Sequence, residues 1–264
     1  MPHSILPTSE ELESLWIEKY GRPEKKKGLL AWRWRHKYFL PSDIYEALVA
    51  RLVRDGDRWL DVGGGEAIFP HNPTTEKKLV ARCARVVALD PSDNIHKNRS
   101  AHETVQSLVQ DYHPQTQFSL VTMRMVVEHV PDPESFAGAL ARLVQPGGLV
   151  AIFTVGLWSP VTLASRAMPF RFHHAIKQHF WGSDPEGTFP THYRMNTRAA
   201  LGRCFGDAGF SEELFARADD LSVFANFKWL SRVDLLAWRG FKAVGIPYPE
   251  RNVLAVYRRN AAGA

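Results

Sequence analysis

Short apolar runs alternate with amphipathic stretches over most of the chain, and this alternation predicts the fold. The apolar runs cover residues 58–62, 86–89, 105–108, 118–123 and 149–155. The stretches that repeat apolar residues at helical spacing cover residues 75–83, 133–143 and 197–208. Continuous apolar strands that alternate with helices are typical of a parallel sheet covered on both faces. The pattern therefore predicts a doubly wound α/β fold.

The amino-terminal part of the chain departs from this alternation. Residues 8–20 predict a helix with Ser9 as its N-cap, because acidic residues in the first turn suit the helix dipole. Residues 41–55 predict another helix before the first strand. Between the two helices, Trp32 and Trp34 alternate with cations. That segment is either an anion-binding edge or a solvated arm with two buried tryptophans.

The carboxyl-terminal part predicts two more strands, near residues 213–218 and at 252–257. Together these patterns divide the chain into an amino-terminal helical and basic arm, 1–40, and one α/β domain, 41–264. The domain is expected to contain a helical insertion at about 159–195, because that stretch lies outside the alternation. A length of 264 residues fits one domain with such additions better than two full domains.

Charge and cysteine content narrow the class of protein only slightly. Lysine and arginine outnumber aspartate and glutamate by 33 to 28, for a net charge of +5, which favours an anionic partner without establishing one. Cys83 and Cys204 lie far apart with no metal-ligand spacing, so we expect no structural metal and a reducing, cytoplasmic location. The first residues lack the apolar segment of a signal peptide, and no apolar run predicts a membrane-spanning helix.

The strongest local signal is a strand that runs into a glycine-rich turn, Trp59–Gly65 (WLDVGGG). Glycines there allow positive φ and let backbone N–H groups approach a ligand. The next strand ends in Asp90, whose carboxylate at the strand tip can accept both hydroxyls of a ribose. Glu66 and Ala67 stand where the dinucleotide fingerprint expects more glycine, which disfavours a nicotinamide cofactor.

In combination with two later motifs, this segment resembles the class I S-adenosylmethionine (SAM)-dependent methyltransferases. Residues 118–133 (FSLVTMRMVVEHVPDP) are similar to the strand 4 motif of that family, although Ser119 replaces the usual aspartate. Residues 143–148 (LVQPGG) match its turn before strand 5. The order of motifs resembles the group that includes quinone-biosynthesis methyltransferases. The resemblance implies a seven-stranded Rossmann-like sheet, mostly parallel, with an antiparallel last strand.

The resemblance also implies which residues bind the cofactor. Gly63 and Gly65 would pass close to the methionine part of SAM, Asp61 would orient the loop and the SAM amino group, and Asp90 would bind the ribose. Asp111 would contact the adenine amino group, with Gln110 as its close competitor. The complete set of expected cofactor-binding residues is Asp61, Gly63, Gly64, Gly65, Asp90, Pro91, Asp111, Met123 and Arg124. Ala67 and a long loop at 68–74 depart from the family pattern.

Methyl transfer from a sulfonium is an in-line displacement that depends mainly on positioning, so no single catalytic residue has to be visible. His129 is the candidate general base, and its alternative is a local packing or capping role. The candidate substrate-binding residues are His174, His179, Tyr193 and Arg194. His174 and His179 lack the three- or four-residue spacing of a helical metal pair, so no metal is expected there.

Residues 226–242 mix bulky apolar side chains with four cations. This stretch either contacts an anionic membrane surface or lipid-like acceptor, or packs on the sheet with its cations turned outward. A nucleic-acid partner is disfavoured by the modest net charge and by the residues after strand 4, which lack the Asn/Asp-Pro-Pro-aromatic motif. The sequence does not predict an oligomeric state.

These observations predict a SAM-dependent methyltransferase that yields S-adenosylhomocysteine (SAH) and methylates a small molecule, anionic or lipid-like, at oxygen, nitrogen or carbon. Two alternatives stay open at this point. The first is a protein of the same fold that binds SAM or SAH without chemistry. The second is an NAD(P)-dependent Rossmann oxidoreductase.

Overall fold

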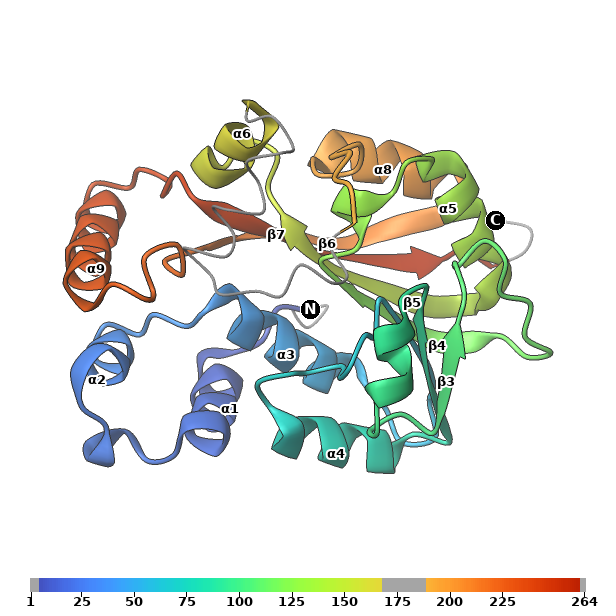
Figure 1. Cartoon of the computed structure of the whole chain (residues 1–264), viewed down its shortest axis with the longest axis horizontal. Helices are drawn as coiled ribbons and strands as arrows, with labels where there is room; N and C mark the ends of the chain where they lie inside the picture. Colours follow the sequence, from blue (N-terminus) through green and yellow to red (C-terminus); the bar gives the residue numbers. More distant parts are fainter. Residues whose placement is uncertain (1–4, 168–188, 262–264) are drawn as a thin grey trace.

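The computed structural model describes residues 5–167 and 189–261. Seven strands form one sheet in the order β3-β2-β1-β4-β5-β7-β6 (Figure 1). They are β1 (Arg58–Val62), β2 (Arg85–Asp90), β3 (Glu103–Gln106), β4 (Phe118–Arg124), β5 (Val144–Val155), β6 (Phe210–Asp219) and β7 (Arg251–Arg259). The first five strands are parallel, and β7 runs antiparallel between β5 and β6. The predicted doubly wound sheet with an antiparallel last strand is therefore confirmed.

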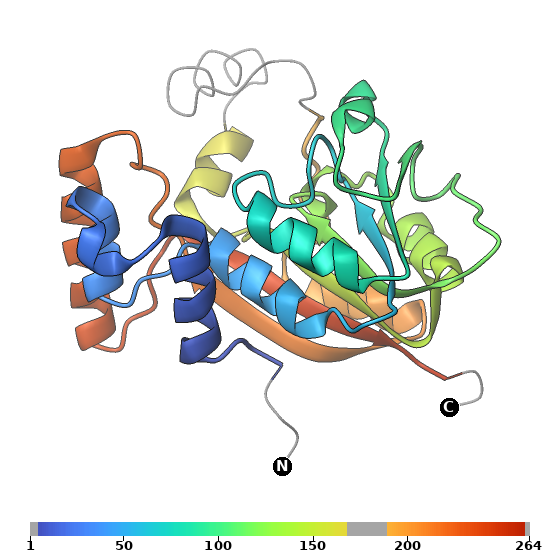
Figure 2. The ribbon, with the colours of Figure 1, turned by 90° about the horizontal axis from the view of Figure 1, so that it is seen from below.

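Helices cover both faces of the sheet (Figure 2). The helices are α1 (Ser9–Tyr20), α2 (Gly28–Arg35), α3 (Pro41–Leu52), α4 (Pro73–Arg82), α5 (Pro133–Leu143), α6 (Pro160–Ala167), α8 (Arg198–Asp207) and α9 (Lys228–Ala243), with short 3-10 turns at Pro23–Lys25, Asp93–Lys97 and Val127–His129. Apolar residues of α5 and α8 fill one face, and those of α3 and α4 fill the other. Because both faces are buried, the central strands read as continuous apolar runs.

Several boundaries differ from those predicted. The third strand, β3, begins two residues earlier than expected, and it pairs Val105 with Leu89 of β2. The Pro-Gly-Gly segment expected as a turn before β5 lies inside that strand, because pairing with β4 already starts at Val144. The register shifts between Val144 and Leu149, and Gly147 takes φ +78° in the irregular part. The segment therefore still connects α5 to the regular part of β5, but its first residue, Val144, already pairs with β4.

The first helix begins after Thr8, so the prediction of Ser9 as N-cap is wrong. The Thr8 hydroxyl accepts from the Glu11 N–H, and the Glu11 carboxylate accepts from the Thr8 N–H at 2.7 Å. This reciprocal capping box satisfies two helix-end donors, which Ser9 alone could not do. Helix α1 then packs against α3 and α4. Lys19 near its end forms buried ion pairs with Asp43 and Glu46 of α3.

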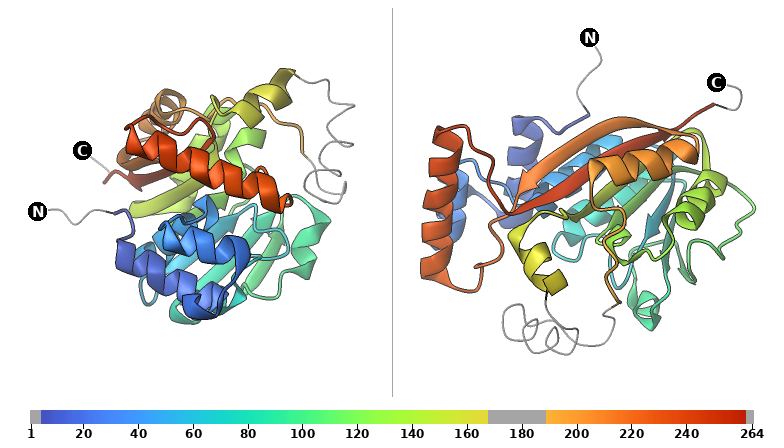
Figure 3. Two further views of the ribbon diagram at one scale, coloured as in Figure 1. Left: turned by 90° about the vertical axis from the view of Figure 1, so that its left-hand side faces the viewer. Right: turned by 90° about the horizontal axis from the view of Figure 1, so that it is seen from above.

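The helix pair α2 and α9 forms a separate corner at one end of the sheet (Figure 3). Packing of α9 directly on the sheet is therefore not what the structure shows. The buried side chain of α2 is Arg33, while the two tryptophans expected to be buried are only half-buried. Tyr38 and Trp238 meet edge to face at 5.2 Å in the core of this corner.

The predicted insertion begins with α6 directly after β5. His174 and His179 lie outside the described residues, so their expected role in substrate binding stays a prediction. Among the helices that the structure describes, none is long and apolar enough to cross a membrane.

Candidate functional site

A crevice opens at the carboxyl ends of β1, β2 and β4, where an open α/β sheet binds its ligands. Its cavity has a volume of about 450 Å³. That volume lies within the roughly 300–1,000 Å³ range of small-molecule and cofactor sites. The residues that line it are Val62, Gly63, Leu89, Asp90, Pro91, Ser107, Leu108, Val109, Gln110, Met125, Val126, His129, Val130, Pro131, Phe136, Phe189, Pro190 and His192.

Close contacts explain why the turn after β1 consists of glycines. Gly63 has φ +75°, and a Cβ on it would lie 2.4 Å from Cγ2 of Val126. A Cβ on Gly64 would lie 2.8 Å from the Cβ of Ala88 on β2. Only glycine lets the chain pass this close to both neighbours. The turn therefore brings bare backbone to the wall of the crevice.

Asp90 at the end of β2 is held by two backbone donors. The Gly65 N–H donates to its Oδ2 at 3.1 Å, and the Ser92 N–H donates to its Oδ1 at 2.8 Å. A carboxylate offers about four acceptor positions, so two remain for a ligand. With Asp90 and Pro91 both lining the crevice, the site fits the paired hydroxyls of a ribose.

Asp61 lies beneath the glycine turn and is not part of the crevice wall. The Thr122 hydroxyl donates to its Oδ1 at 2.5 Å, and Trp59 Nε1 donates to the same hydroxyl at 2.7 Å. Burial raises the pKa of the Asp61 carboxyl to about 7. The carboxyl packs against Gly64, whose Cβ position lies 3.3 Å from Asp61 Oδ2. Asp61 thus lies against the turn, and its expected role in orienting the turn and the SAM amino group stays a prediction.

The long loop after the turn is anchored from below. Glu76 of α4 is buried and accepts hydrogen bonds from the N–H groups of Ile68, at 3.1 Å, and Phe69, at 3.4 Å. Asn72 caps α4 and also donates to Glu46, at 2.9 Å. Glu46 in turn binds Lys19. The loop that departs from the family pattern is therefore tied through α3 to the amino-terminal helix.

The residues after β4 that reach the crevice are not the ones expected. Met123 is fully buried in the core, and Arg124 is half-buried but does not line the cavity. Met125 and Val126 line it instead, and Met125 takes φ +54° as the chain leaves the strand. The strand simply extends past the position at which the motif was expected to turn. The cofactor contacts predicted for Met123 and Arg124 stay predictions.

After β3, the neighbouring residues Gln110 and Asp111 are the two candidates for contact with an adenine. Gln110 is half-buried and lines the crevice, whereas Asp111 is exposed and does not. The Gln110 carbonyl accepts from Arg142 at 3.0 Å, which fixes its backbone and leaves its side-chain amide for a ligand. The structure therefore favours the position of Gln110 over that of Asp111 for contact with an adenine.

His129 lines the crevice, with its ring edge-on to Phe189 at 6.2 Å. Its Nδ1 lies 2.9 Å from the carbonyl oxygen of Pro190. A carbonyl can only accept, so Nδ1 carries the hydrogen in this contact. In the neutral ring, Nε2 then holds a free lone pair. The expected base is therefore oriented by a backbone carbonyl rather than left to rotate.

The segment that precedes α8 is pinned over the crevice by Glu128. The Glu128 carbonyl accepts from the N–H groups of His192, at 2.7 Å, and Tyr193, at 3.0 Å. Arg194 donates to the Pro131 carbonyl at 2.7 Å. Tyr193 and Arg194 themselves do not line the cavity, whereas Phe189 and His192 do. No sequence signal distinguished those two, because the contact depends on the path of the backbone between distant elements.

Ligation of a metal was not expected, and the described ranges contain no group of three histidine, cysteine, aspartate or glutamate side chains placed to hold one. Cys83 is buried, Cys204 is half-buried, and neither forms a disulfide.

Comparison with known proteins agrees with this geometry. Residues 32–213 match a family of methyltransferase domains, and the chain belongs to that family. A ubiquinone biosynthesis O-methyltransferase of Caulobacter sp. (strain K31) is 32% identical over 133 residues, which is 43% of this chain and 50% of that protein. One from Klebsiella pneumoniae subsp. pneumoniae is 35% identical over 112 residues, 38% of this chain and 43% of that protein. The chain thus matches about half the length of these relatives.

Solved structures share the fold at low sequence identity. The N-methyltransferase NodS of Bradyrhizobium japonicum WM9, in complex with SAH, covers 95% of this chain and 99% of its own, with a TM-score of 0.50 at 13% identity. A SAM-dependent methyltransferase of Methanosarcina mazei covers 81% and 98%, with a TM-score of 0.52 at 14% identity. The fold is that of the class I SAM-dependent methyltransferases. An NAD(P)-dependent oxidoreductase is not favoured by any of these similarities.

Proposed function

We propose that the protein transfers a methyl group from SAM to a small-molecule acceptor. The observation that carries this proposal is the Asp90 carboxylate, which two backbone N–H groups orient at the rim of a crevice formed by the glycine turn. Asp90 would hold the ribose, the backbone of Gly63 would pass the methionine part, and Gln110 would face the adenine. Membership of a methyltransferase domain family supports the assignment.

Bound in this crevice, SAM would supply a methyl group already activated by its sulfonium charge. The residues of the chain then have to bind, orient and exclude water. Val126 and Phe136 provide apolar walls, and Phe189 covers the side next to His129. Such walls favour transfer to the acceptor over reaction with solvent.

We infer that the acceptor atom is a hydroxyl oxygen. The curated relatives are named O-methyltransferases, which supports oxygen over nitrogen or carbon. A hydroxyl must lose its proton as the new bond forms, and His129 Nε2 is the basic atom at the crevice that its Pro190 contact leaves available. His129 would take that proton and pass it to solvent. A cytoplasmic location is part of this proposal, because both cysteines are free, as expected in a reducing compartment.

A metabolite screen tests the transferase activity directly. The protein is incubated with a small-molecule extract and SAM whose methyl group carries deuterium. We expect products that gain one labelled methyl group, in a reaction that Asp90→Ala abolishes. If SAH binds but no labelled product forms from any extract, the protein is a binding protein of the same fold and the catalytic proposal fails.

We also propose that α9 makes peripheral contact with an anionic membrane. The face of α9 opposite its buried residues is apolar, with Trp229, Val233 and Leu236 exposed at 71%, 45% and 49%. These positions are spaced by four and three residues, so they form one stripe along the helix. The cations of the helix are Lys228, Arg232, Arg239 and Lys242, while its acid, Asp234, is buried and bound to Tyr248.

An apolar stripe beside cations fits the interface of an anionic bilayer. Pairing of two copies through the same face would instead bring like charges together. Vesicle flotation tests the choice: we expect binding to vesicles with anionic lipid, little binding to zwitterionic ones, and loss of binding in Trp229→Ser/Val233→Ser. Ile17→Ser, at an exposed apolar position of α1, is the matched control. Concentration-dependent dimerisation without vesicle binding would contradict the proposal.

A further inference from the structure

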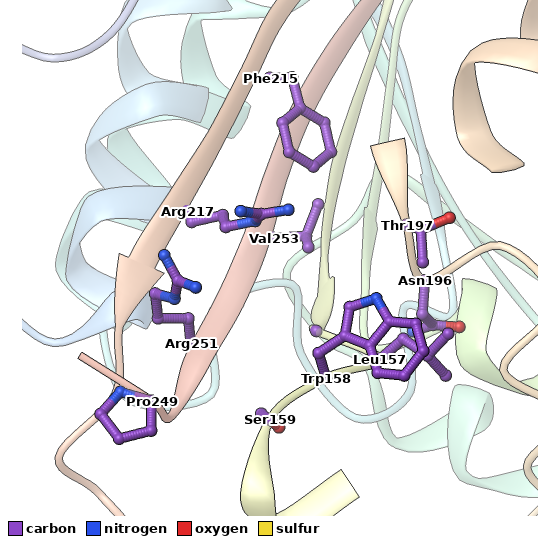
Figure 4. Close-up of a pocket in the computed structure, with 11 residues that line it drawn as sticks. Leu157, Trp158, Ser159, Asn196, Thr197, Phe215, Arg217, Pro249, Arg251 and Val253 are labelled. Atoms are coloured by element: carbon purple, nitrogen blue, oxygen red, sulfur yellow. The ribbon is translucent and has the colours of Figure 1, made fainter. Parts of the chain in front are cut away.

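A second, smaller cavity lies at the end of β5, between β6, β7 and the start of α8. Its volume is about 80 Å³, so it has room for a compact group rather than for a whole cofactor. Trp158 and Thr197 line one side, and Phe215, Arg217 and Arg251 line the other (Figure 4). None of these residues takes part in the crevice described above.

Two arginines from adjacent strands face this cavity. Arg217 of β6 pairs with Val253 of β7, and Asp219 pairs with Arg251, so the arginines are diagonal neighbours in the sheet. Diagonal residues in an antiparallel pair lie roughly 7–8 Å apart. Figure 4 shows the Arg217 side chain reaching towards Val253 and the Arg251 guanidinium turned towards β6 below it, on the same side of the cavity.

Neither guanidinium forms an ion pair within the part of the chain that the structure describes, although Asp219 lies opposite Arg251 in the ladder. Within 5–167 and 189–261, no carboxylate lies within 4 Å of Arg217 or Arg251, and their side chains make no hydrogen bond. Arg198 nearby is different, because Glu212 binds it at 2.6 Å. Arg198 and Arg217 both lie over the ring of Phe215, at 5.6 and 5.8 Å. Two converging positive charges repel each other unless an anion lies between them.

The frame of the cavity is fixed by backbone contacts. The Gly156 N–H donates to the Arg251 carbonyl at 3.1 Å, and the Leu157 N–H donates to the Asn196 carbonyl at 3.1 Å. A Cβ on Gly156 would lie 2.5 Å from that Arg251 oxygen, so the close approach requires glycine. The side-chain amide of Asn196 donates to the Val155 carbonyl at 2.9 Å. These contacts join the end of β5 to β7 and to the segment before α8 around the cavity.

Helix α8 adds to the positive potential of the cavity. Thr197 is its N-cap and accepts from the Ala200 N–H at 3.2 Å. The amino end of a helix carries a partial positive charge that stabilises anions nearby. The helix end therefore reinforces the two arginines, and the exposed ring of Trp158, at 70%, offers an apolar surface beside them.

The cavity and the crevice share a short piece of chain. His192 lines the crevice, and Asn196 lines the cavity. Four residues span at most about 14 Å even when fully extended. The lining residues His192 and Asn196 therefore lie no farther apart than this.

We infer that this cavity binds the anionic group, carboxylate or phosphate, of the methyl acceptor. The inference rests on the proposed function and names the class of its substrate: an acid whose planar or apolar body lies against Trp158 and Phe215. Guanidinium groups are suited to both anions because their N–H donors match paired oxygens. The volume of about 80 Å³ fits such a head group. The arginines would hold the acid while the remainder of the acceptor extends towards the crevice.

Calorimetric titration of the full chain tests the inference. The probes are benzoate and phenyl phosphate, with neutral benzamide as a shape-matched control, and SAH is titrated separately. The variants are Arg217→Gln, Arg251→Gln and the double variant, and Arg198→Gln is the control because its charge is already paired. We expect the double variant to bind the two anions about tenfold more weakly or worse, since each charged hydrogen bond contributes of that order. Neutral benzamide should bind the wild-type protein and the double variant with equal affinity.

Unchanged SAH affinity in all variants shows that the fold and the cofactor site are intact. With SAH binding retained, equal anion affinity in wild type and double variant overturns the inference and leaves the proposed function standing. Failure of both anions to bind the wild-type protein overturns it as well. Absence of SAH binding by the wild type would instead contradict the proposed function itself.

Discussion

The Gly65 N–H donates to Asp90 Oδ2 over 3.1 Å, so the glycine turn after β1 and the acidic end of β2 hold each other in place. This contact joins two strands at the edge of the sheet where the crevice opens. Because the donor is a backbone N–H group, the orientation of the carboxylate and of its remaining acceptor positions does not depend on a mobile side chain. The glycine turn and Asp90 therefore act as one binding unit.

Gly63→Ala should weaken ligand binding for a steric reason. Gly63 and Gly56 have similar φ values, +75° and +81°. A Cβ on Gly63 would lie 2.4 Å from Val126, whereas a Cβ on Gly56 would have no neighbouring atom within 4 Å. Both alanines should cost about 1–2 kcal/mol of stability from the left-handed backbone. We expect only Gly63→Ala to reduce SAH affinity, by about tenfold or more, because the turn must shift.

Titration calorimetry and urea unfolding of the two glycine variants measure both effects. Adding Val126→Ala to Gly63→Ala removes the clashing methyl group and should restore part of the affinity. Equal affinity losses for Gly63→Ala and Gly56→Ala would show that the backbone conformation, and not the clash with Val126, is the cause.

Asp61 should make SAH binding depend on pH. Burial raises its pKa from the ordinary value of 3.8 to about 7, so the unliganded folded protein holds a proton there between these values. If the cationic amino group of the ligand lies near it, binding favours the carboxylate and releases that proton. We expect affinity to rise from pH 5 to about 7 and to level off above.

The raised pKa of Asp61 also predicts that the stability of the fold decreases as pH rises. Between pH 4 and 7 the folded state binds the Asp61 proton more tightly than the unfolded state, so its contribution to stability is lost as pH rises through about 7. Asp61→Asn should remove both dependences. Calorimetry in buffers of different ionisation enthalpy counts the released proton. Release that persists undiminished in Asp61→Asn would assign it to another group.

The buried ion pairs of Lys19 should make the amino-terminal helix essential to the fold. The Lys19 and Asp43 side chains are 4% and 1% exposed, whereas those of the Lys37–Glu13 pair are 55% and 34% exposed. Lys19→Met leaves two buried carboxylates without their cationic partner, which costs about 3–5 kcal/mol. Lys37→Met should cost less than about 1 kcal/mol. Urea unfolding measures the free energy of unfolding of both variants. Similar losses in the two would contradict a stabilising role for the buried ion pairs of Lys19.

His129→Gln should slow methyl transfer without weakening SAH binding. A general base contributes roughly 10²–10⁴-fold to such a step, so kcat should fall by that order. With the acceptor found by the metabolite screen, the rate of the variant should climb with pH as the acceptor hydroxyl ionises, while that of the wild type levels off earlier. A variant whose pH profile parallels that of the wild type would leave His129 with a packing role.

Local signals predicted much of the fold and part of the site. Strand and helix order followed from periodicity, and α5 has the predicted bounds. Gly63 and Asp90 line the crevice as expected, because a strand end and its turn are adjacent in sequence. The departure at Ser119 lies away from the crevice, near the amino-terminal end of β4, where its hydroxyl donates to Asp57 at 2.7 Å.

The features that the sequence could not predict depend on contacts between elements that are far apart along the chain. Arg217 and Arg251 lie on different strands, and their convergence follows from the antiparallel register of β6 and β7. Phe189 reaches the crevice because the backbone of the following residues binds Glu128. The partner of α9 is α2, which no periodicity within α9 could identify.

A calorimetric titration with SAH, run beside one with NAD, tests the central claim most directly. Wild-type protein should bind SAH and not NAD. Asp90→Ala should bind SAH about ten- to a hundredfold more weakly, because charged hydrogen bonds to the ribose are lost. Asp93→Ala, at an exposed acid three residues away, should bind like the wild type. Unchanged SAH affinity in Asp90→Ala, or binding of NAD alone, would contradict a SAM site in this crevice.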